Sequence, residues 1–217
     1  MKKSILLLAA ICAIPFMSCK DDNDESEGSA VLCPFAVGNT WTYKVEGKYV
    51  KVKQLTQTIE KSYTDDGKTG FSYDKDLSTD NGFALRNTDS DGSIVELRFK
   101  KGHFVDQSVI YKKNAKEGET YKAQVATFSD DDTDYELEEM NMTCVKRDTS
   151  ITVAAGTFNC ICYCMTVYDD GELSDKFYEY YAYNVGLIKN TRYEFPTANK
   201  SDSVMMTQYT LSSYQLK

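Results

Sequence analysis

The sequence predicts an all-β protein, built as a single strongly curved antiparallel sheet or half-open barrel of about ten to twelve short strands. Three observations predict this class. Tyr is abundant, with 16 residues, whereas Pro occurs only 3 times, a composition that favours strands. Short β-prone runs recur between turns that contain Gly or Asp. One stretch, Thr157–Val167, is apolar on both faces, which is typical of a strand in the middle of a sheet.

Alternation along Thr157–Val167 gives this stretch its two apolar faces, because successive side chains of a strand point to opposite sides. One face carries Phe158, Cys160, Cys162 and Cys164, and the other carries Ile161, Tyr163, Met165 and Val167. We therefore expect the stretch to be the central strand, with other structure packed against each side.

The residues on either side of this strand predict hairpins. Ala154-Ala155-Gly156 suits a three-residue loop with Gly156 in the left-handed conformation, which places Val153 opposite Thr157. Asp170-Gly171 is a turn signal. The chain from about Met140 to Glu194 therefore reads as a meander of antiparallel strands.

The earlier part of the domain predicts further strands. In Thr40–Val45, Trp41, Tyr43 and Val45 share one face, and we interpret Trp41 as a core anchor, the alternative being an exposed ring that stacks on a sugar. Asp65–Lys68 is interpreted as the tip of a hairpin. The remaining predicted strands lie within Gln54–Tyr63, Phe71–Tyr73, Gly82–Arg86, Ile94–Phe99, His103–Val105 and Val204–Leu211.

The amino terminus has the pattern of an export signal. A cationic start at Lys2 and Lys3 precedes the apolar run Ile5–Phe16, which predicts a signal peptide over residues 1–18. Ser18-Cys19 resembles the looser bacterial lipobox of Bacteroides-like organisms, which implies cleavage before Cys19 and its acylation. An ordinary secretory leader with an incidental Cys is the alternative.

Residues 19–30 predict a lipidated Cys followed by a flexible linker. Lys20–Gly28 holds five acids and no aliphatic or aromatic side chain, so it cannot bury apolar area. Its start resembles the signal that sends such lipoproteins to the outer face of the outer membrane. The alternative is a charged spacer on a lipoprotein that faces the periplasm. A single all-β domain is expected from 31 to 217.

Three motifs within that domain carry a second resemblance. The segments VGNTWTYKV, ITVAAGTFNC and YYAYNVGLIK are similar to a pattern found in uncharacterised, β-rich secreted proteins and lipoproteins of bacteria. Since the shared residues are turn glycines and core aromatics, the resemblance implies a fold class and assigns no active site.

The net negative charge of the chain limits the kinds of molecule it can bind. The formal net charge is −8, and it becomes −10 when the acid-free leader takes Lys2 and Lys3 with it. Such acidity argues against nucleic acid and against electrostatic docking on anionic lipid. No second apolar run approaches the roughly 20 residues of a membrane span. We therefore expect contact with membrane lipid only through acylated Cys19, and we predict no cofactor.

Five cysteines remain in the domain after Cys12 and Cys19 are set aside: Cys33, Cys144, Cys160, Cys162 and Cys164. The spacing along one strand disfavours a zinc site, because one zinc ion cannot reach sulfurs about 13 Å apart. Small buried hydrophobes are the simplest interpretation. One disulfide, Cys144–Cys164, is allowed if a bulge near Asp148 adjusts the register.

Three short features have both a functional and a structural interpretation. Asn87–Ile94 imitates the start of a calcium loop, but Arg98 occupies the position of the required Glu, so we favour an Asp91-Gly92 hairpin turn. His103 has no matching nucleophile motif and is interpreted as a partly exposed strand residue. Asp202-Ser203-Val204 resembles a bacterial O-glycosylation signal, which makes Ser203 a weak candidate.

These patterns predict a lipid-anchored, non-enzymatic binding or assembly module of a bacterial outer membrane. They leave its ligand open, a glycan or a protein being the candidates. Tyrosines of one strand region, Tyr178, Tyr180, Tyr181 and Tyr183, could line its site or serve in packing. A glycan-acting hydrolase is the rival, its carboxylate pair drawn from residues such as Asp74, Asp76, Glu96 and Glu179. A carrier of apolar cargo, with a large dry cavity, is the third hypothesis.

Overall fold

A computed structural model describes residues 30–73, 81–128, 135–195 and 203–217. Within these ranges all strands are antiparallel and form two sheets. The eight-stranded sheet has the order β2-β1-β13-β12-β11-β10-β9-β8, and the five-stranded sheet has the order β3-β4-β5-β6-β7. The predicted all-β class is confirmed, and neither sheet closes into a barrel. The leader and Cys19 lie outside the described residues.

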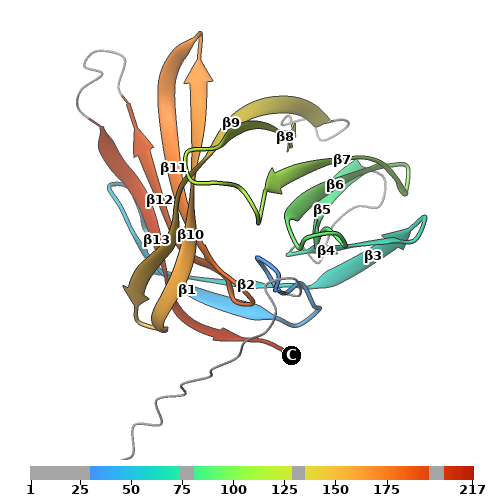
Figure 1. The fold of residues 1–217 in the computed structure, drawn as a ribbon, viewed down its shortest axis with the longest axis horizontal. Coiled ribbons are helices and arrows are strands. Elements are labelled where there is room, and N and C mark those ends of the chain that lie inside the picture. The colour runs from blue at the N-terminus through green and yellow to red at the C-terminus, as the bar shows by residue number, and fades with distance from the viewer. Residues whose placement is uncertain (1–29, 74–80, 129–134, 196–202) are drawn as a thin grey trace, which may run out of the picture.

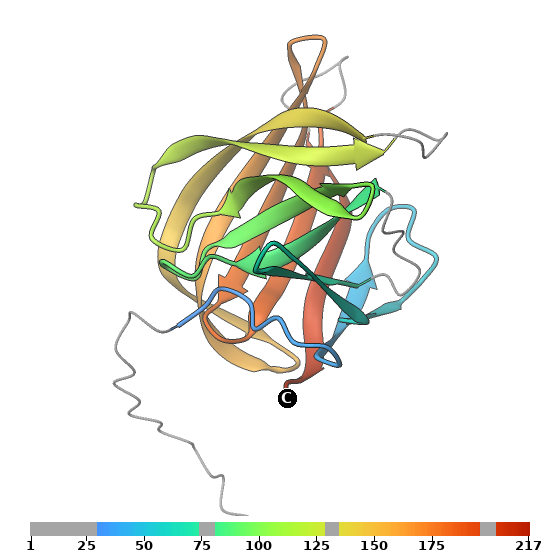
Figure 2. The ribbon, with the colours of Figure 1, turned by 90° about the vertical axis from the view of Figure 1, so that its right-hand side faces the viewer.

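The strands of the large sheet are β1 (Thr40–Glu46), β2 (Gln54–Thr58), β8 (Thr120–Phe128), β9 (Tyr135–Val153), β10 (Gly156–Asp169), β11 (Glu172–Ala182), β12 (Gly186–Glu194) and β13 (Val204–Gln215). Those of the small sheet are β3 (Lys61–Asp65), β4 (Lys68–Ser72), β5 (Asn81–Asn87), β6 (Ile94–Lys100) and β7 (His103–Tyr111). The large sheet curves, and the small sheet lies across its concave side (Figures 1 and 2).

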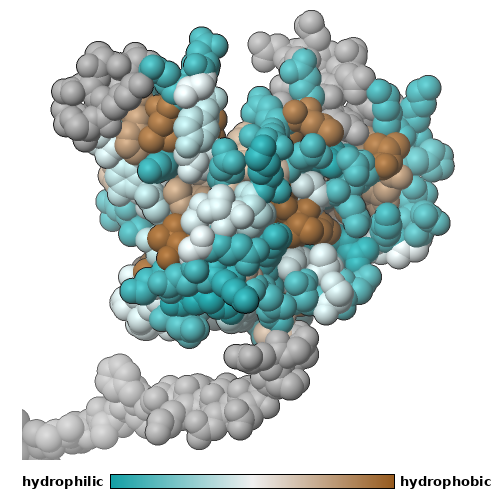
Figure 3. Space-filling model, turned by 45° about the horizontal axis from the view of Figure 1, so that its top comes forward, coloured by the Kyte–Doolittle hydropathy of each residue, from teal (hydrophilic) through white to brown (hydrophobic). Residues whose placement is uncertain are grey.

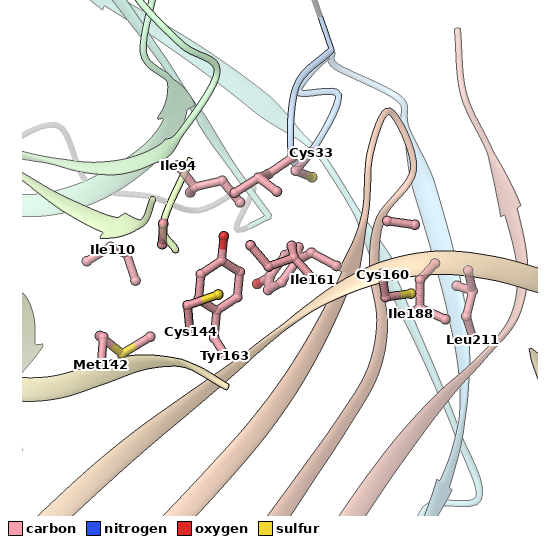
Figure 4. Packing of buried hydrophobic residues seen from close by; sticks show 14 of the residues in the cluster. Cys33, Ile94, Ile110, Met142, Cys144, Cys160, Ile161, Tyr163, Ile188 and Leu211 are labelled. Atoms are coloured by element: carbon pink, nitrogen blue, oxygen red, sulfur yellow. The ribbon is translucent and has the colours of Figure 1, made fainter. Parts of the chain in front are cut away.

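The predicted central strand is the core of the large sheet. β10 pairs with β9 on one side and β11 on the other, and residues 160–164 are buried in an unbroken run. Ile161 and Tyr163 pack toward Ile94 and Ile110 of the small sheet (Figure 4). Two-sided burial, predicted from the alternation of Thr157–Val167, is confirmed for the middle of the strand.

Tight turns of one type connect several hairpins. Asp66-Gly67, Lys101-Gly102 and Asp170-Gly171 each have positive φ at both residues, between 47° and 79°. This is the type I′ pattern, whose twist matches that of the flanking strands. The turns predicted at Asp66-Gly67 and Asp170-Gly171 are therefore confirmed, and the positive φ explains why Gly occupies the second position.

The β9–β10 hairpin differs from the predicted register by one residue. Gly156 pairs with Val153 and Thr157 with Thr152, so Ala154-Ala155 forms a two-residue turn in place of the expected three-residue loop. Gly156 has a φ of 139°, but it lies in the strand itself. A second shift occurs beside Asp148, whose φ is 52°. The pairing shifts by one position there and by one more between Lys146 and Cys144, so the partners of the later residues move by two further positions in all.

Trp41 is the core anchor predicted for the first strand. It is buried together with Tyr43 and Val45, and its indole N–H donates to the Val185 carbonyl at 2.7 Å. That carbonyl belongs to the turn before Gly186, whose φ is 104°. A Cβ on Gly186 would lie 3.4 Å from the Trp41 indole nitrogen. Glycine thus permits both the turn and the close approach of the ring.

The segment before β1 joins the two sheets at one end of the molecule. The Leu32 amide donates to the Gly92 carbonyl in the β5–β6 turn, and the Asn184 amide donates to the Val31 carbonyl from the β11–β12 turn. The Asn87 side chain donates to the Cys33 carbonyl at 2.6 Å. A turn of each sheet is therefore bound to the same short stretch of chain.

A second junction lies at the edge of β8, where the backbone ladder of the large sheet ends. The Gln124 amide donates to the Ser108 hydroxyl at 3.0 Å, and the Ala126 amide donates to the Glu96 carboxylate at 2.9 Å. Arg98 donates to the Gln124 carbonyl at 3.2 Å. Side chains of β6 and β7 thus satisfy backbone groups that an edge strand would otherwise leave free.

Large exposed hydrophobic side chains are dispersed over the described surface. Tyr49, Val52, Val105 and Tyr168 are each more than half exposed. Tyr49 and Val52 lie in the β1–β2 loop, whereas Val105 is on β7 and Tyr168 on β10. On the face drawn in Figure 3 the hydrophobic areas are separate patches between hydrophilic ones. The described residues contain no helix long and apolar enough to cross a membrane.

Arg98 provides a test of the junction at β8. It is fully buried and ion-paired to Asp106 at 2.6 Å and Glu96 at 3.6 Å. We expect Arg98→Met to lower the free energy of unfolding by about 3–5 kcal/mol, because it leaves the Glu96 charge buried without its partner. Urea unfolding measures the change. The control, Lys122→Met, removes an exposed pair with Glu139 and should cost at most about 1 kcal/mol. Equal losses in the two variants would contradict this account.

Candidate functional site

An open pocket of about 370 Å³ lies on the outer face of the large sheet. It is formed by aromatic side chains, two lysines and two hydroxyl residues: Tyr178, Tyr180, Tyr193, Phe195, Lys176, Lys189, Thr191 and Ser203. Its volume is at the small end of the range of about 300–1,000 Å³ seen for small-molecule sites. We take this surface, named here the tyrosine pocket, as the candidate site.

The register of β11 with β12 creates the pocket. Lys176 lies opposite Tyr193, Tyr178 opposite Thr191, and Tyr180 opposite Lys189. Because side chains alternate along a strand, these six share one face. They form two antiparallel columns of three, with the lysines at diagonally opposite corners.

The two lysines face aromatic rings. Lys176 Nζ lies 5.5 Å from the ring centre of Phe195, and Lys189 Nζ lies 5.9 Å from that of Tyr180. No ion pair with a carboxylate is formed by either lysine within the described ranges. Among the described residues, the two ammonium groups of the pocket therefore face aromatic rings and no carboxylate.

The tyrosines offer both ring surfaces and hydroxyl groups. Tyr178 and Tyr193 meet edge to face, with ring centres 6.0 Å apart. Burial, with the neighbouring Cys162 adding to it, raises the pKa of Tyr180 to about 12, and burial also raises the pKa of Tyr178. Both phenols therefore stay neutral near pH 7 and can donate as well as accept hydrogen bonds.

The thiols of β10 form the neighbouring column of this face. Cys162 lies opposite Tyr180 and Cys164 opposite Tyr178. Burial raises the pKa of Cys162 to about 11 and that of Cys160 to about 12. These thiols remain protonated near neutral pH, so they act as small packing groups and not as nucleophiles.

The Cys144–Cys164 disulfide that the sequence allows is not formed, and all five described cysteines are free. Cys144 lies opposite Tyr163, whereas Cys164 lies opposite Thr143. Since adjacent positions of a strand face opposite sides, the two thiols point away from each other across the sheet. The bulge beside Asp148 does shift the register, but the shift leaves Cys144 and Cys164 one position out of direct opposition.

The inner face holds a carboxylate of its own. Glu179 accepts hydrogen bonds from Asn190 at 2.6 Å and from the hydroxyl of Tyr111 on β7. Burial raises the pKa of this carboxyl group, and the hydrogen bonds from Tyr111 and Asn190 oppose that shift only in part. Glu179 thus links the two sheets from within the core.

Glu96 and Glu179, two of the acids considered for a glycan hydrolase, each have a partner in the fold. The Glu96 carboxylate accepts a hydrogen bond from the Ala126 amide at the β8 edge, and the Glu179 carboxylate accepts from Tyr111 and Asn190. Asp74 and Asp76, also considered for that role, lie outside the described residues.

A cavity of about 150 Å³ lies between the sheets. Most of its lining is aromatic, with rings from Phe35, Trp41, Tyr43, Tyr73, Tyr111 and Tyr181. It is smaller than ordinary ligand pockets, and its walls differ from the Leu, Phe and Met lining that a carrier of apolar cargo requires.

The structure places the other sequence candidates as follows. His103 begins β7 and is exposed, 3.4 Å from Asp65. Asp91-Gly92 lies in the turn between β5 and β6. Within the described residues no group of His, Cys, Asp and Glu is arranged to hold a metal. Ser203 borders the tyrosine pocket.

Sequence reasoning found part of the tyrosine pocket. Tyr178 and Tyr180 line it, whereas Tyr181 is a core residue and Tyr183 accepts a hydrogen bond from Arg147. Lys176 and Lys189 were missed, together with Tyr193 and Phe195. Alternation in Lys176–Tyr180 and in Lys189–Tyr193 places these residues on one face of each strand. Only the register of β11 with β12 shows that the two sets lie side by side.

Glu179→Gln tests the inner network. Because the pKa of Glu179 is raised on folding, the native state binds the proton more tightly than the unfolded state. Wild-type stability should therefore fall, relative to the variant, as pH rises from the ordinary Glu pKa toward the raised one. The slope within that window is about 1.4 kcal/mol per pH unit. Urea unfolding from pH 4 upward measures it, with the surface variant Glu138→Gln as control. A wild-type-to-variant difference that does not change with pH would contradict the interpretation.

Comparison with known proteins leaves the family open. No family model matches the chain, and no curated protein matches it. Among solved structures, the chain is similar to a Bacteroides fragilis protein described as exported and as having a YmcC-like fold. The two are 13% identical, with a TM-score of 0.46 over 86% of this chain and 100% of that one. It is also similar to a protein of Parabacteroides distasonis described as a lipoprotein, at 14% identity and a TM-score of 0.38, over 86% of this chain and 99% of that one.

Proposed function

We propose that this protein is a non-enzymatic binding module, held by lipid on a bacterial outer membrane and facing the cell exterior, and that the tyrosine pocket is its ligand site. One observation carries the proposal. A pocket of about 370 Å³ on a regular part of the large sheet combines three tyrosines with two lysines that have no carboxylate partner among the described residues.

The support for a binding role comes from how the two faces of β11 differ. Its inward side chains are engaged: Glu179 is hydrogen-bonded to Tyr111 and Asn190, and Tyr181 belongs to the core. Its outward side chains, Lys176, Tyr178 and Tyr180, border open space. Aromatic rings beside a few polar groups are the usual composition of a small-molecule site.

The support for lipid anchoring at the cell surface comes from the amino-terminal leader. An 18-residue signal peptide that ends before Cys19, followed by acidic residues, predicts acylation and export to the cell surface. Several acyl chains hold a protein far more firmly than one, since each buried CH₂ contributes about 0.8 kcal/mol.

Cys19→Ser tests the anchor. We expect the wild-type chain to sediment with outer membranes and to carry an acyl mass at Cys19 in mass spectrometry of the mature amino terminus. The variant should appear in the soluble fraction, since it lacks the acyl acceptor. An unacylated wild-type chain, or a variant that still fractionates with membranes, would overturn lipid anchoring. Protease digestion of intact cells then separates the exterior face from the periplasmic one.

Tyr178→Ala with Tyr193→Ala tests the pocket. A glycan array probed with the full chain in detergent should show binding that falls at least tenfold in the double variant, because both rings that meet at the pocket are lost. The control is Tyr168→Ala, which removes an exposed tyrosine on the β10–β11 hairpin. Thermal unfolding shows whether each variant is folded. Retained binding in a folded double variant would reject the pocket as the ligand site.

A further inference from the structure

We infer that the ligand of the tyrosine pocket is a short acidic oligosaccharide, whose sugar rings carry a carboxylate or a sulfate. This inference rests on the proposed binding function and names its ligand class. The relevant features are the positions of the two lysines, the arrangement of the tyrosines, the place of the pocket within the sheet and the charge of the whole chain.

The two lysines give the pocket its positive charge. Three lysines elsewhere on the described surface are paired with glutamates: Lys44 with Glu46, Lys112 with Glu119 and Lys122 with Glu139. Lys176 and Lys189 instead lie over the rings of Phe195 and Tyr180. A ligand carboxylate or sulfate would give each ammonium group the charged partner that the described residues do not supply.

Strand geometry sets the spacing of those charges. Lys176 and Lys189 stand at diagonal corners of the block, four residues apart along the strands and one strand apart across them. Their Cα atoms are therefore roughly 14 Å apart. A ligand with charged groups on more than one unit can address both lysines at once.

The aromatic and hydroxyl groups suit a sugar. A pyranose ring has a C–H face, which packs on an aromatic ring, and an edge of hydroxyl groups, which form hydrogen bonds. The perpendicular rings of Tyr178 and Tyr193 form a corner against which such a ring can lie. Thr191, Ser203 and the tyrosine hydroxyls supply donors and acceptors around it.

The position of the pocket argues against an extended peptide. Peptides commonly bind a sheet by adding a strand to a free edge. β11 and β12 are interior strands, flanked by β10 and β13, so their backbone groups are already used in the sheet. Recognition here must come from side chains alone, which matches a ligand that is rich in hydroxyl groups.

The net charge limits the length of the ligand. The chain has a formal charge of −8, which repels a long polyanion as a whole. Two lysines can still attract one or two acidic units held close to them, within the screening distance of about 10 Å at 0.1 M salt. A short acidic segment therefore fits this surface better than a continuous acidic polymer.

The test is isothermal titration of the full chain in detergent with three named probes: trigalacturonate, a sulfated galactotriose and neutral galactotriose. We expect at least one acidic probe to bind tenfold or more tightly than the neutral one, and to weaken as salt is raised. The double variant Lys176→Gln, Lys189→Gln should bind the acidic probe no better than the neutral one. Lys122→Gln, on β8, is the matched control and should leave binding unchanged.

The possible results test the acidic ligand and the binding function separately. The two acidic probes distinguish carboxylate from sulfate. Equal binding of neutral and acidic probes, lost in the Tyr178→Ala, Tyr193→Ala variant, would overturn the acidic ligand while the binding function stands. Acidic binding that survives in the lysine variant would also overturn it. No binding of any probe, together with an empty glycan array, would reject both proposals.

Discussion

The edge of β8, whose backbone groups need partners from outside the large sheet, is the constraint on which the rest of this fold depends. The large sheet ends there, and a strand edge in contact with another sheet must have its amide and carbonyl groups satisfied. Glu96, Arg98 and Ser108 do this from β6 and β7. Because the junction is made by side chains, the sheets can meet at an angle that a continuous ladder would not allow. The segment around Leu32 closes the opposite end, and the aromatic core fills the space between.

Because side chains alternate between the two faces of a strand, one face of β11 contributes to the core and the other to the tyrosine pocket. On β11 the same residue type serves both: Tyr181 faces the core, and Tyr178 and Tyr180 face outward into the tyrosine pocket. Glu179 connects inward to Tyr111 of the small sheet, so the strand that presents the pocket is also held from behind. A ligand surface on such a strand is pre-organised, which reduces the entropy lost on binding.

Local patterns in the sequence were sufficient for much of the fold and for only part of the site. Alternation in Thr157–Val167 predicted a doubly buried strand, Asp-Gly pairs predicted turns, and Trp41 was correctly interpreted as an anchor. The register of β9 with β10 was wrong because Ala154-Ala155 forms a two-residue turn and because two shifts between Thr149 and Cys144 move the pairing further. The Cys144–Cys164 disulfide that the sequence allowed is not formed. The division into two sheets, with β7 paired to β6 and β8 paired to β9, is set by long-range strand pairing that no local pattern specifies. The two pocket lysines are brought together only by the pairing of β11 with β12.

The buried thiols have a consequence for how the chain reaches its folded state. Burial raises the pKa of Cys33 and Cys160 to about 12, so the folded protein offers almost no thiolate to an oxidant at neutral pH. Before folding, all five thiols of the domain are accessible and titrate as ordinary cysteines. In an oxidising compartment, folding and thiol oxidation would therefore compete. A chain whose β9–β11 meander has closed around Cys160 would no longer expose that thiol to the oxidant.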